Sequence, residues 1–335
     1  MASTSETVVY DDLFSLVART RKSRISDNIG NSQPTLDIFL NEGAVEVEDG
    51  GESIEERLMY AYQDVEWMSD RQQVSTDDKN GVTTAVYPWR FALAPVNISK
   101  TDELKAQKSK DAAKTFAESK IIQARQGLRT SINTAMLSAA TGKAMLGFQD
   151  TIKTDPTTGT LGGVDQSLAA NSWFRNQTNT ASIGFQTQTV TNVFDGWVNV
   201  GASYEAASDI NDEVTHIGMG STLYNQAIST LESAGYTRFT NQSKPGLNGG
   251  GQKTDSGPMF RSARLYKDRA FAASSIYGYN IKTMKLKIMK GANFAKTPFV
   301  MTDATGVLGK VCFYLVGIQL VACNPRRNFV LSAVS

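Results

Sequence analysis

The sequence predicts an α+β protein in which one long helix and several long strands form the framework. Three observations predict this class. Apolar residues recur at helical spacing between residues 104 and 140. An Asn-Gly pair separates two strand-like segments, residues 57–68 and 82–98, which is a hairpin signal. Strand-like segments then dominate from residue 261 onward.

Size and charge exclude several classes of protein. With 335 residues the chain can bury a large core and form two or three lobes. Its net charge of +1 gives no argument for a nucleic-acid binder. The longest mostly apolar run, residues 311–323, is shorter than the roughly 20 residues that a membrane span needs. The N-terminus lacks the apolar segment of a signal peptide. We therefore expect a soluble protein that is assembled in the cytoplasm without a membrane.

The sequence offers little material for catalysis. His216 is the only histidine, and with two distant cysteines it cannot make a Cys/His zinc site. A Ser-His-Asp triad would have to use this residue. It lies in a strand-like segment, where a packed and hydrogen-bonded histidine is expected. The glycine-rich segment 246–254 lacks the spacing of a phosphate-binding loop, because Gln252 separates the last glycine from Lys253. We predict a surface loop there, no catalytic, cofactor-binding or metal-ligating residue, and no enzyme activity.

The two cysteines, Cys312 and Cys323, lie in the apolar run near the C-terminus. A turn near Gly317 could place them opposite each other. In a reducing compartment a structural disulfide is not expected, so we predict buried free thiols.

Residues 1–33 are polar and contain four arginine or lysine residues between positions 19 and 24, which is typical of an arm. A short helix is expected at Leu36–Leu40. The stretch 42–56 is acidic, with seven aspartates and glutamates. We hypothesise that this acidic stretch pairs across subunits with basic residues of the long helix or of residues 261–290.

The two strand-like segments after the acidic stretch are expected to form a long ribbon, with the tryptophans Trp67 and Trp89 able to meet across the pair. Pro88 and Pro95 cannot donate ladder hydrogen bonds, which predicts an exposed edge. A two-stranded ribbon is barely stable alone, so a neighbouring subunit would serve as its support.

The long helix has one apolar face and one basic face. The apolar face comprises Ala113, Phe116, Ala117, Ile121, Ala124, Leu128, Ile132, Ala135 and Ala139. The basic face carries Lys105, Lys108, Lys110, Lys114, Lys120, Arg125 and Arg129. A helix of about 30 residues spans about 45 Å, more than a compact domain of this size needs. Together with the ribbon, it suggests a chain that reaches its neighbours.

The remaining segments alternate between helix and strand. Helices are expected at 189–208 and 221–234, with a strand at 215–219 between them. Residues 261–290 read as basic strands, and 309–334 as the closing strands.

Taken in order, several segments resemble the major capsid protein of tailed bacteriophages, which has the Hong Kong 97 type of capsid fold. The segments are Val47–Ile54 with Met59-Tyr60, Trp67–Ser69, Trp89–Ser99, Leu161–Asp165 with Ser172–Asn176, and Gly317–Leu320 with Asn324–Asn328. No single segment is diagnostic, but their order extends over most of the chain.

The resemblance implies five parts. They are an N-terminal arm (1–35), a short helix and extended β-hairpin loop (36–100), a peripheral domain with the spine helix (101–186), an axial domain (187–300), and C-terminal strands that return to the peripheral domain (301–335). The extended loop would lie over an adjacent subunit.

The implied function is self-assembly as hexamers and pentamers into the icosahedral head that encloses a double-stranded DNA genome. The alternative is an encapsulin-type nanocompartment shell of the same fold. The implied location is the virion, with assembly in the host bacterial cytoplasm. Implied partners are other copies of the chain, a portal protein, a separate scaffolding or decoration protein, and packaged DNA through non-specific contact. Some members cross-link covalently through a lysine of the extended loop; such a cross-link through Lys79, near the tip of the loop, is not expected.

Overall fold

The computed structural model describes residues 33–71, 73, 77–101, 110–179, 195–210, 212–233, 259–301 and 309–332. For residues 110–118, 195 and 230–233 it describes the backbone alone. The expected arm up to residue 32 and the glycine-rich segment 246–254 lie outside the described residues.

The described chain alternates helices with short and long strands. The helices are α2 (Pro34–Asn41), α4 (Lys110–Leu137), α5 (Phe148–Thr151), α6 (Asp195–Ala207) and α7 (Ser221–Ser233), with 3₁₀ turns η1 (Ala169–Phe174), η2 (Lys290–Ala292) and η4 (Pro325–Arg327). The strands are β1 (Val45–Glu48), β2 (Ser53–Met59), β3 (Val82–Pro88), β4 (Arg90–Ser99), β5 (Thr160–Leu161), β6 (Val164–Asp165), β7 (Gln177–Asn179), β8 (His216–Met219), β9 (Met259–Phe260), β10 (Ala263–Lys267), β11 (Ile276–Tyr279), β12 (Met284–Met289), β13 (Ala295–Lys296), β14 (Val300–Met301), β15 (Gly309–Ala322) and β16 (Phe329–Leu331).

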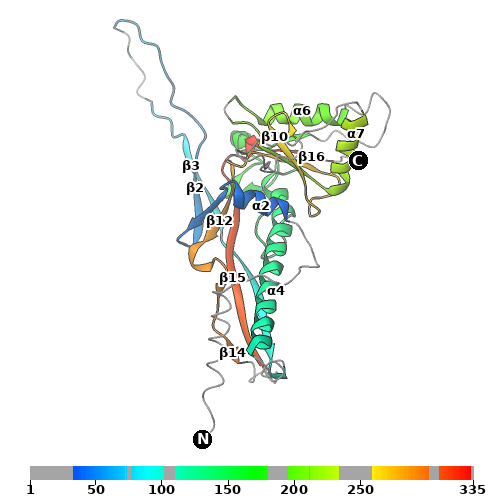
Figure 1. Ribbon diagram of the computed structural model, residues 1–335. Helices are drawn as coiled ribbons and strands as arrows, with labels where there is room; N and C mark the ends of the chain where they lie inside the picture. The colour runs from blue at the N-terminus through cyan, green and yellow to red at the C-terminus, as the bar shows by residue number, and fades with distance from the viewer. Residues whose placement is uncertain are drawn as a thin grey trace, which may run out of the picture.

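The first sheet is organised around β15, which runs alongside α4 in Figure 1. β15 pairs with β4 along one edge and with β12, β13 and β14 in succession along the other, while β1 extends the sheet from β12. Tyr314, Val316 and Ile318 are buried on alternate positions of β15. The guanidinium of Arg125 on α4 lies over the Tyr314 ring, which places this face of the sheet against the helix.

The predicted long helix is confirmed, with a shorter C-terminal end. Ile121, Ala124, Leu128 and Ile132 are buried as expected, whereas Ala139 lies beyond the helix and is exposed. The reason is local: the Ala140 N–H donates to the Asp150 carboxylate (2.7 Å) instead of to a helical carbonyl.

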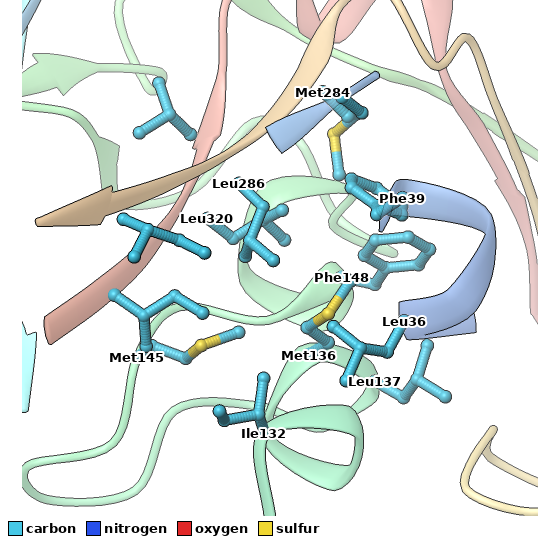
Figure 2. Packing of buried hydrophobic residues seen from close by; sticks show 14 of the residues in the cluster. Leu36, Phe39, Ile132, Met136, Leu137, Met145, Phe148, Met284, Leu286 and Leu320 are labelled. Carbon is cyan, nitrogen blue, oxygen red and sulfur yellow. The ribbon is translucent and has the colours of Figure 1, made fainter. Parts of the chain in front are cut away.

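The main hydrophobic core joins α2, α4, α5 and the first sheet (Figure 2). Phe148 lies at its centre and is fully buried. Its ring meets Phe39 of α2 at 6.0 Å and Tyr279 of β11 at 5.0 Å, the latter edge to face. Because Tyr279 belongs to the second sheet, these aromatic rings connect both sheets through one core.

A buried polar cluster fixes α2 to α4 and to the loop after β10. The Asp268 carboxylate accepts hydrogen bonds from Thr35 Oγ1 (2.9 Å) and Asn133 Nδ2 (3.0 Å), and Asn133 Oδ1 accepts one from the Leu36 N–H (3.1 Å). Each of these buried groups therefore has a partner. Pro34 begins α2 at a position where a missing N–H costs nothing. The short helix expected at Leu36–Leu40 is confirmed.

The second sheet has the order β7-β16-β11-β8-β10-β9. A second cluster of buried residues lies between this sheet and the helices α6 and α7; it includes Trp197, Val200, Ile217 and Leu223. The C-terminal strands divide between the sheets, since β15 lies in the first and β16 pairs with β11 and β7 in the second. The predicted helices 189–208 and 221–234 and the strand 215–219 are confirmed over their described parts.

The predicted ribbon is wrong in its boundaries. The first strand is Ser53–Met59, not residues 57–68, and residues 82–98 form two strands that separate at Trp89. β3 pairs with β2, whereas β4 joins the first sheet. Pro88 cannot donate to continue the ribbon, and the buried Trp89 carries the chain into the core. Trp89 therefore does not meet Trp67, which is 92% exposed beyond the end of β2.

The cysteine geometry also differs from the expectation. Residues 309–322 form one continuous strand, so there is no turn at Gly317. Cys312 and Cys323 lie 11 residues apart along this extended segment, or about 36 Å at the usual strand rise. Neither forms a disulfide, as predicted, and their spacing prevents one within the chain; Cys312 is buried as expected, whereas Cys323 is only partly buried.

Candidate functional site

A two-stranded ribbon, β2 and β3 with the loop between them, projects from the body of the molecule (Figure 1). Its strands pair from Ser53↔Pro88 to Met59↔Val82. The last strand pair and the chain beyond it bear large exposed apolar side chains. These are Met59, Tyr60, Tyr62, Val65, Trp67, Met68 and Val82. A concentration of exposed apolar groups on one protrusion is typical of a protein–protein contact.

The base of the ribbon is fixed to the body. The Val86 N–H donates to the Gly162 carbonyl (2.8 Å), and the Tyr87 hydroxyl donates to the Ala322 carbonyl (3.1 Å). At the other end of the strands, one residue beyond the last pair, the Tyr60 ring stacks on Trp173 with centroids 5.3 Å apart. The direction of the ribbon is thus set by contacts within the same chain.

Gly162 is the position where this attachment is tightest. It lies in the two-residue turn between β5 and β6, where Gly162 and Gly163 have φ of 56° and 78°, as a type I′ hairpin requires. A Cβ on Gly162 would lie 2.8 Å from the Tyr87 ring and 2.9 Å from the Ala85 Cβ. Only glycine allows the turn to lie this close to β3.

The loop of the ribbon has its own short-range order. Gln63 Nε2 donates to the Lys79 carbonyl (2.8 Å), and the Lys79 N–H donates back to Gln63 Oε1 (3.0 Å). The Lys79 ammonium pairs with Asp64. These bonds join the two arms of the loop beyond the last strand pair.

An ion cluster lies beside the ribbon base, where β1 pairs with β12. The Lys287 ammonium lies 2.5 Å from Glu46 and 2.8 Å from Glu48, and Lys285 lies 2.5 Å from Glu46. Glu56 of β2 approaches Lys287 at 3.5 Å. The Lys287 side chain is only 7% exposed. The cluster therefore connects the ribbon to the first sheet by charge as well as by packing.

The charges in this cluster support one another. Burial alone would lower the pKa of Lys287, but hydrogen bonds to Glu46 and Glu48 outweigh it and raise that pKa above its ordinary value. Burial likewise acts to raise the pKa of Glu46, yet the bonds from Lys285 and Lys287 hold it below its ordinary value.

This cluster corrects the hypothesis of pairing across subunits for much of the acidic stretch. Glu46, Glu48, Asp49 and Glu56 all pair inside the chain, with Lys285, Lys287 or Lys290. The reason is register, because β1 and β12 place their alternate acidic and basic residues on the same face. Glu52 and Glu55 are exposed and have no ion pair within the described part of the chain.

Cys323 lies next to the same cluster. Its thiol donates to Glu56 Oε1 at 3.4 Å. Burial, together with the Glu56 charge, raises the pKa of the thiol to about 12. Cys323 is therefore a protonated, unreactive thiol at neutral pH.

His216 is a packed histidine, as predicted. It is 3% exposed, and its ring nitrogens lie 2.9 Å from Thr215 Oγ1 and 3.1 Å from Glu42 Oε1. Burial lowers its pKa despite the nearby Glu42 carboxylate. The ring thus joins the end of α2 to β8. Across the residues that the structure covers, no group of three His, Cys, Asp or Glu side chains could hold a metal ion.

A second exposed apolar surface lies on the first sheet, on the face opposite α4. Phe91 and Leu93 of β4 are about half exposed, and the neighbouring Phe313 and Val300 also face solvent. The register places Leu93 opposite Leu315 and Pro95 opposite Phe313. No helix in the described ranges is long and apolar enough to cross a bilayer.

The sequence analysis missed the ion cluster and the apolar loop residues. Glu46 and Glu48 alternate, as do Lys285 and Lys287, and this matching period of two was the available signal for paired strands. The apolar side chains of the loop from Tyr62 to Met68 were assigned to a strand instead of to an exposed surface.

Solved structures with a similar fold come from capsids. A chain from the capsid asymmetric unit of cyanophage A-1(L) superposes with a TM-score of 0.66 and 14% identity, covering 94% of this chain and 97% of that one. The capsid of a native GTA particle gives 0.58 and 11%, covering 94% and 95%. The capsid of Myoviridae phage XM1 gives 0.54 and 11%, covering 94% and 97%.

Neither a protein-family model nor a curated protein sequence matches the chain. The likeness is therefore one of fold. The chain has the α+β fold of the phage capsid proteins of the Hong Kong 97 type, as the sequence resemblance implied.

Proposed function

We propose that this chain is a major capsid protein that assembles as hexamers and pentamers into the icosahedral head of a double-stranded DNA phage. One observation carries the proposal: a body with a closed core, in the capsid fold, bears a projecting ribbon whose apolar loop is left largely exposed by the described part of the chain. A monomeric enzyme has no use for such a loop, and association buries it.

In this proposal each of the five segments expected from the resemblance has its own role in the shell. The segments are 1–35, 36–100, 101–186, 187–300 and 301–335. In this proposal the ribbon lies over an adjacent subunit, α4 is the spine of a peripheral domain, and the second sheet forms the axial domain. The second buried cluster, which lies between the second sheet and the helices α6 and α7, supports this division, while the main core joins the two sheets. Because β16 belongs to the second sheet, the last segment would contribute to both domains.

The partners follow from this role. Other copies of the chain are the main partner. A portal protein, a separate scaffolding or decoration protein and non-specific contact with packaged DNA complete the set. The chain would have no enzymatic activity, would be assembled in the host cytoplasm and would end in the virion. A nanocompartment shell is the second candidate, but the similar structures named above come from phage capsids and a GTA particle.

Electron microscopy of the protein expressed alone tests the proposal. Closed shells, or discrete pentamers and hexamers, are the expected result. A strictly monomeric protein at all salt concentrations, also when co-expressed with a scaffolding protein, would overturn it. Shells that enclose a protein cargo instead of DNA in their native host would favour the nanocompartment.

A further inference from the structure

The Asn-Gly pair before β3 does not form the tight turn that its sequence suggests. β2 and β3 are joined by the longer segment 60–81, and Asn80 and Gly81 are its last two residues. Neither residue has the positive φ that a type I′ turn requires. Gly81 is needed for another reason, because a Cβ there would lie 2.2 Å from the Ala61 carbonyl oxygen. The presence of Asn80 is left without a structural explanation.

An Asn-Gly pair can also react with itself, because the glycine nitrogen can attack the side-chain amide carbon of the asparagine. Glycine has no side chain to hinder this approach. Asn80 is exposed, whereas Gly81 is buried against Ala61. Water therefore reaches the side chain that would be attacked, on the opposite side of the pair from Ala61.

The Asn80 side chain is turned back onto the main chain that would attack it. Its Oδ1 accepts a hydrogen bond from the Val82 N–H at 3.4 Å. This bond closes a ring of atoms that includes both the Asn80 Cγ and the Gly81 nitrogen, so one Asx turn holds the two reacting atoms. The same N–H would face the negative charge that develops on Oδ1 during the attack.

The Tyr60 hydroxyl acts on the other side of the pair. It donates to the main-chain carbonyl of Asn80 at 2.5 Å, and its ring is fixed by the stack on Trp173. A donor on that carbonyl polarises the peptide group and makes the adjoining Gly81 N–H more acidic. Within the described part of the chain, the Gly81 N–H donates to no acceptor. No hydrogen bond therefore has to break before this group loses its proton.

We infer that Asn80 and Gly81 form a self-modifying site, at which the chain slowly deamidates the end of its own ribbon loop. Hydroxide removes the Gly81 amide proton, and the nitrogen then forms a bond to the Asn80 Cγ. The bond between Cγ and the side-chain nitrogen breaks, and that nitrogen leaves as ammonia after taking a proton from water. A second water opens the cyclic imide at one of its two carbonyls and leaves aspartate or isoaspartate.

Either product changes the loop permanently. Both add one negative charge beside Asp77 and Asp78. Isoaspartate also carries the main chain through the former side chain, which adds one methylene directly before Val82, the first residue of β3. The site would thus act as a slow clock that alters the charge and the length of the ribbon. This chemistry does not depend on the proposed function.

Peptide mass spectrometry of the dilute full-length chain, sampled over several days, measures the conversion. Asn80 should become aspartate and isoaspartate, faster at pH 9 than at pH 7, because hydroxide starts the reaction. Tyr60→Phe keeps the ring that stacks on Trp173 and removes only the hydroxyl. It should slow the conversion about fivefold, which is the effect of one typical hydrogen bond. Tyr62→Phe is the matched control, because it removes a hydroxyl from an exposed ring of the same loop and should leave the rate unchanged.

The other Asn-Gly pair of the chain, Asn248-Gly249, is measured in the same samples and lies outside the described residues. It shows whether the conditions allow the reaction. An intact Asn80 while Asn248 converts would overturn the inference, and so would the absence of conversion at both pairs. Equal rates for the unaltered chain and Tyr60→Phe would also overturn it, because the pair would then react through its sequence alone.

Discussion

The core around Phe148 and the ribbon beyond Met59 are opposite kinds of structure within one chain. Around Phe148, three elements distant in sequence close an apolar cluster, and the adjoining polar groups of Asp268 and Asn133 have partners inside it. On the ribbon loop, Tyr62 and Trp67 are more than four-fifths exposed, and the bonds are short-range ones within the loop.

The difference teaches where each region obtains its stability. The core is complete in the monomer, so its substitutions should change the free energy of unfolding. In the proposed function the loop is completed by another molecule, so its substitutions should change assembly and leave the subunit intact. The following experiments test this separation, beginning with the largest expected effect.

Phe148→Ala should lower the free energy of unfolding of the subunit by about 3–5 kcal/mol, because it empties the centre of the core. Urea denaturation of the unassembled subunit measures this. Trp67→Ala is the paired variant on the ribbon and should stay within about 0.5 kcal/mol while impairing assembly. A comparable loss of stability for Trp67→Ala would break the comparison.

Lys287→Met should lower the free energy of unfolding by about 2–3 kcal/mol. This is below the range for fully buried ion pairs, because the glutamates retain part of their exposure. Lys290→Met removes an exposed pair with Asp49 and should change the free energy by less than about 0.5 kcal/mol.

The effect of Lys287→Met should depend on pH. The pKa of Glu46 is lowered, so its contribution exists above the ordinary carboxyl pKa of 4.5 and is lost as the pH falls. The pKa of Lys287 is raised, so its contribution exists below 10.5 and is lost as the pH rises through the folded-state value. Denaturation series at pH 3, 7 and 10 check this; a cost that does not shrink at pH 3 would contradict it.

Gly162→Ala should destabilise the subunit by about 2 kcal/mol, from the strained φ and from contact with Tyr87 and Ala85. Gly163 has a similar positive φ, but no atom lies within 4 Å of the position of its Cβ. Gly163→Ala should therefore lower the stability of the subunit by only about 1 kcal/mol. The difference between the two, measured by thermal unfolding, isolates the attachment of the ribbon. Equal costs would mean that the ribbon base is not held by this turn.

Glu52→Lys combined with Glu55→Lys should leave subunit stability within about 0.5 kcal/mol and impair capsid formation, because these two exposed carboxylates remain available to a neighbour. The matching Glu→Gln double variant removes the charge without reversing it and should impair assembly less. Normal shells from the Lys double variant, seen by electron microscopy, would sink the idea of pairing across subunits.

The sequence predicted elements whose signal is local. The period of α4 and the strand at His216 are visible in a short window of residues, and both were placed correctly. The turn assumed at Gly317 failed because that glycine lies in β15 for packing reasons, with Phe91 and Met289 close to its Cβ position. The division of residues 82–98 between two sheets failed because long-range pairing, not local pattern, decides it.

The site was harder to predict than the fold. The Asn-Gly pair correctly marked the ribbon, but the last strand pair is Met59↔Val82, and Gly81 accepts the Tyr60 N–H beyond it. Strand propensity cannot distinguish Trp67 in a paired strand from Trp67 in an exposed loop. The pairing of β4 with β15 is a property of long-range register and cannot be read from the local pattern of either strand.

The position of β15 in chain order has a consequence for synthesis. β15 and β16 follow every other described strand, yet β15 is the central partner of the first sheet and β16 pairs with two strands of the second. A nascent chain can therefore close the first sheet only after β15, and the second only after β16, has left the ribosome. If the chain assembles as proposed, the order of the strands would delay assembly until nearly all of the described chain has been translated.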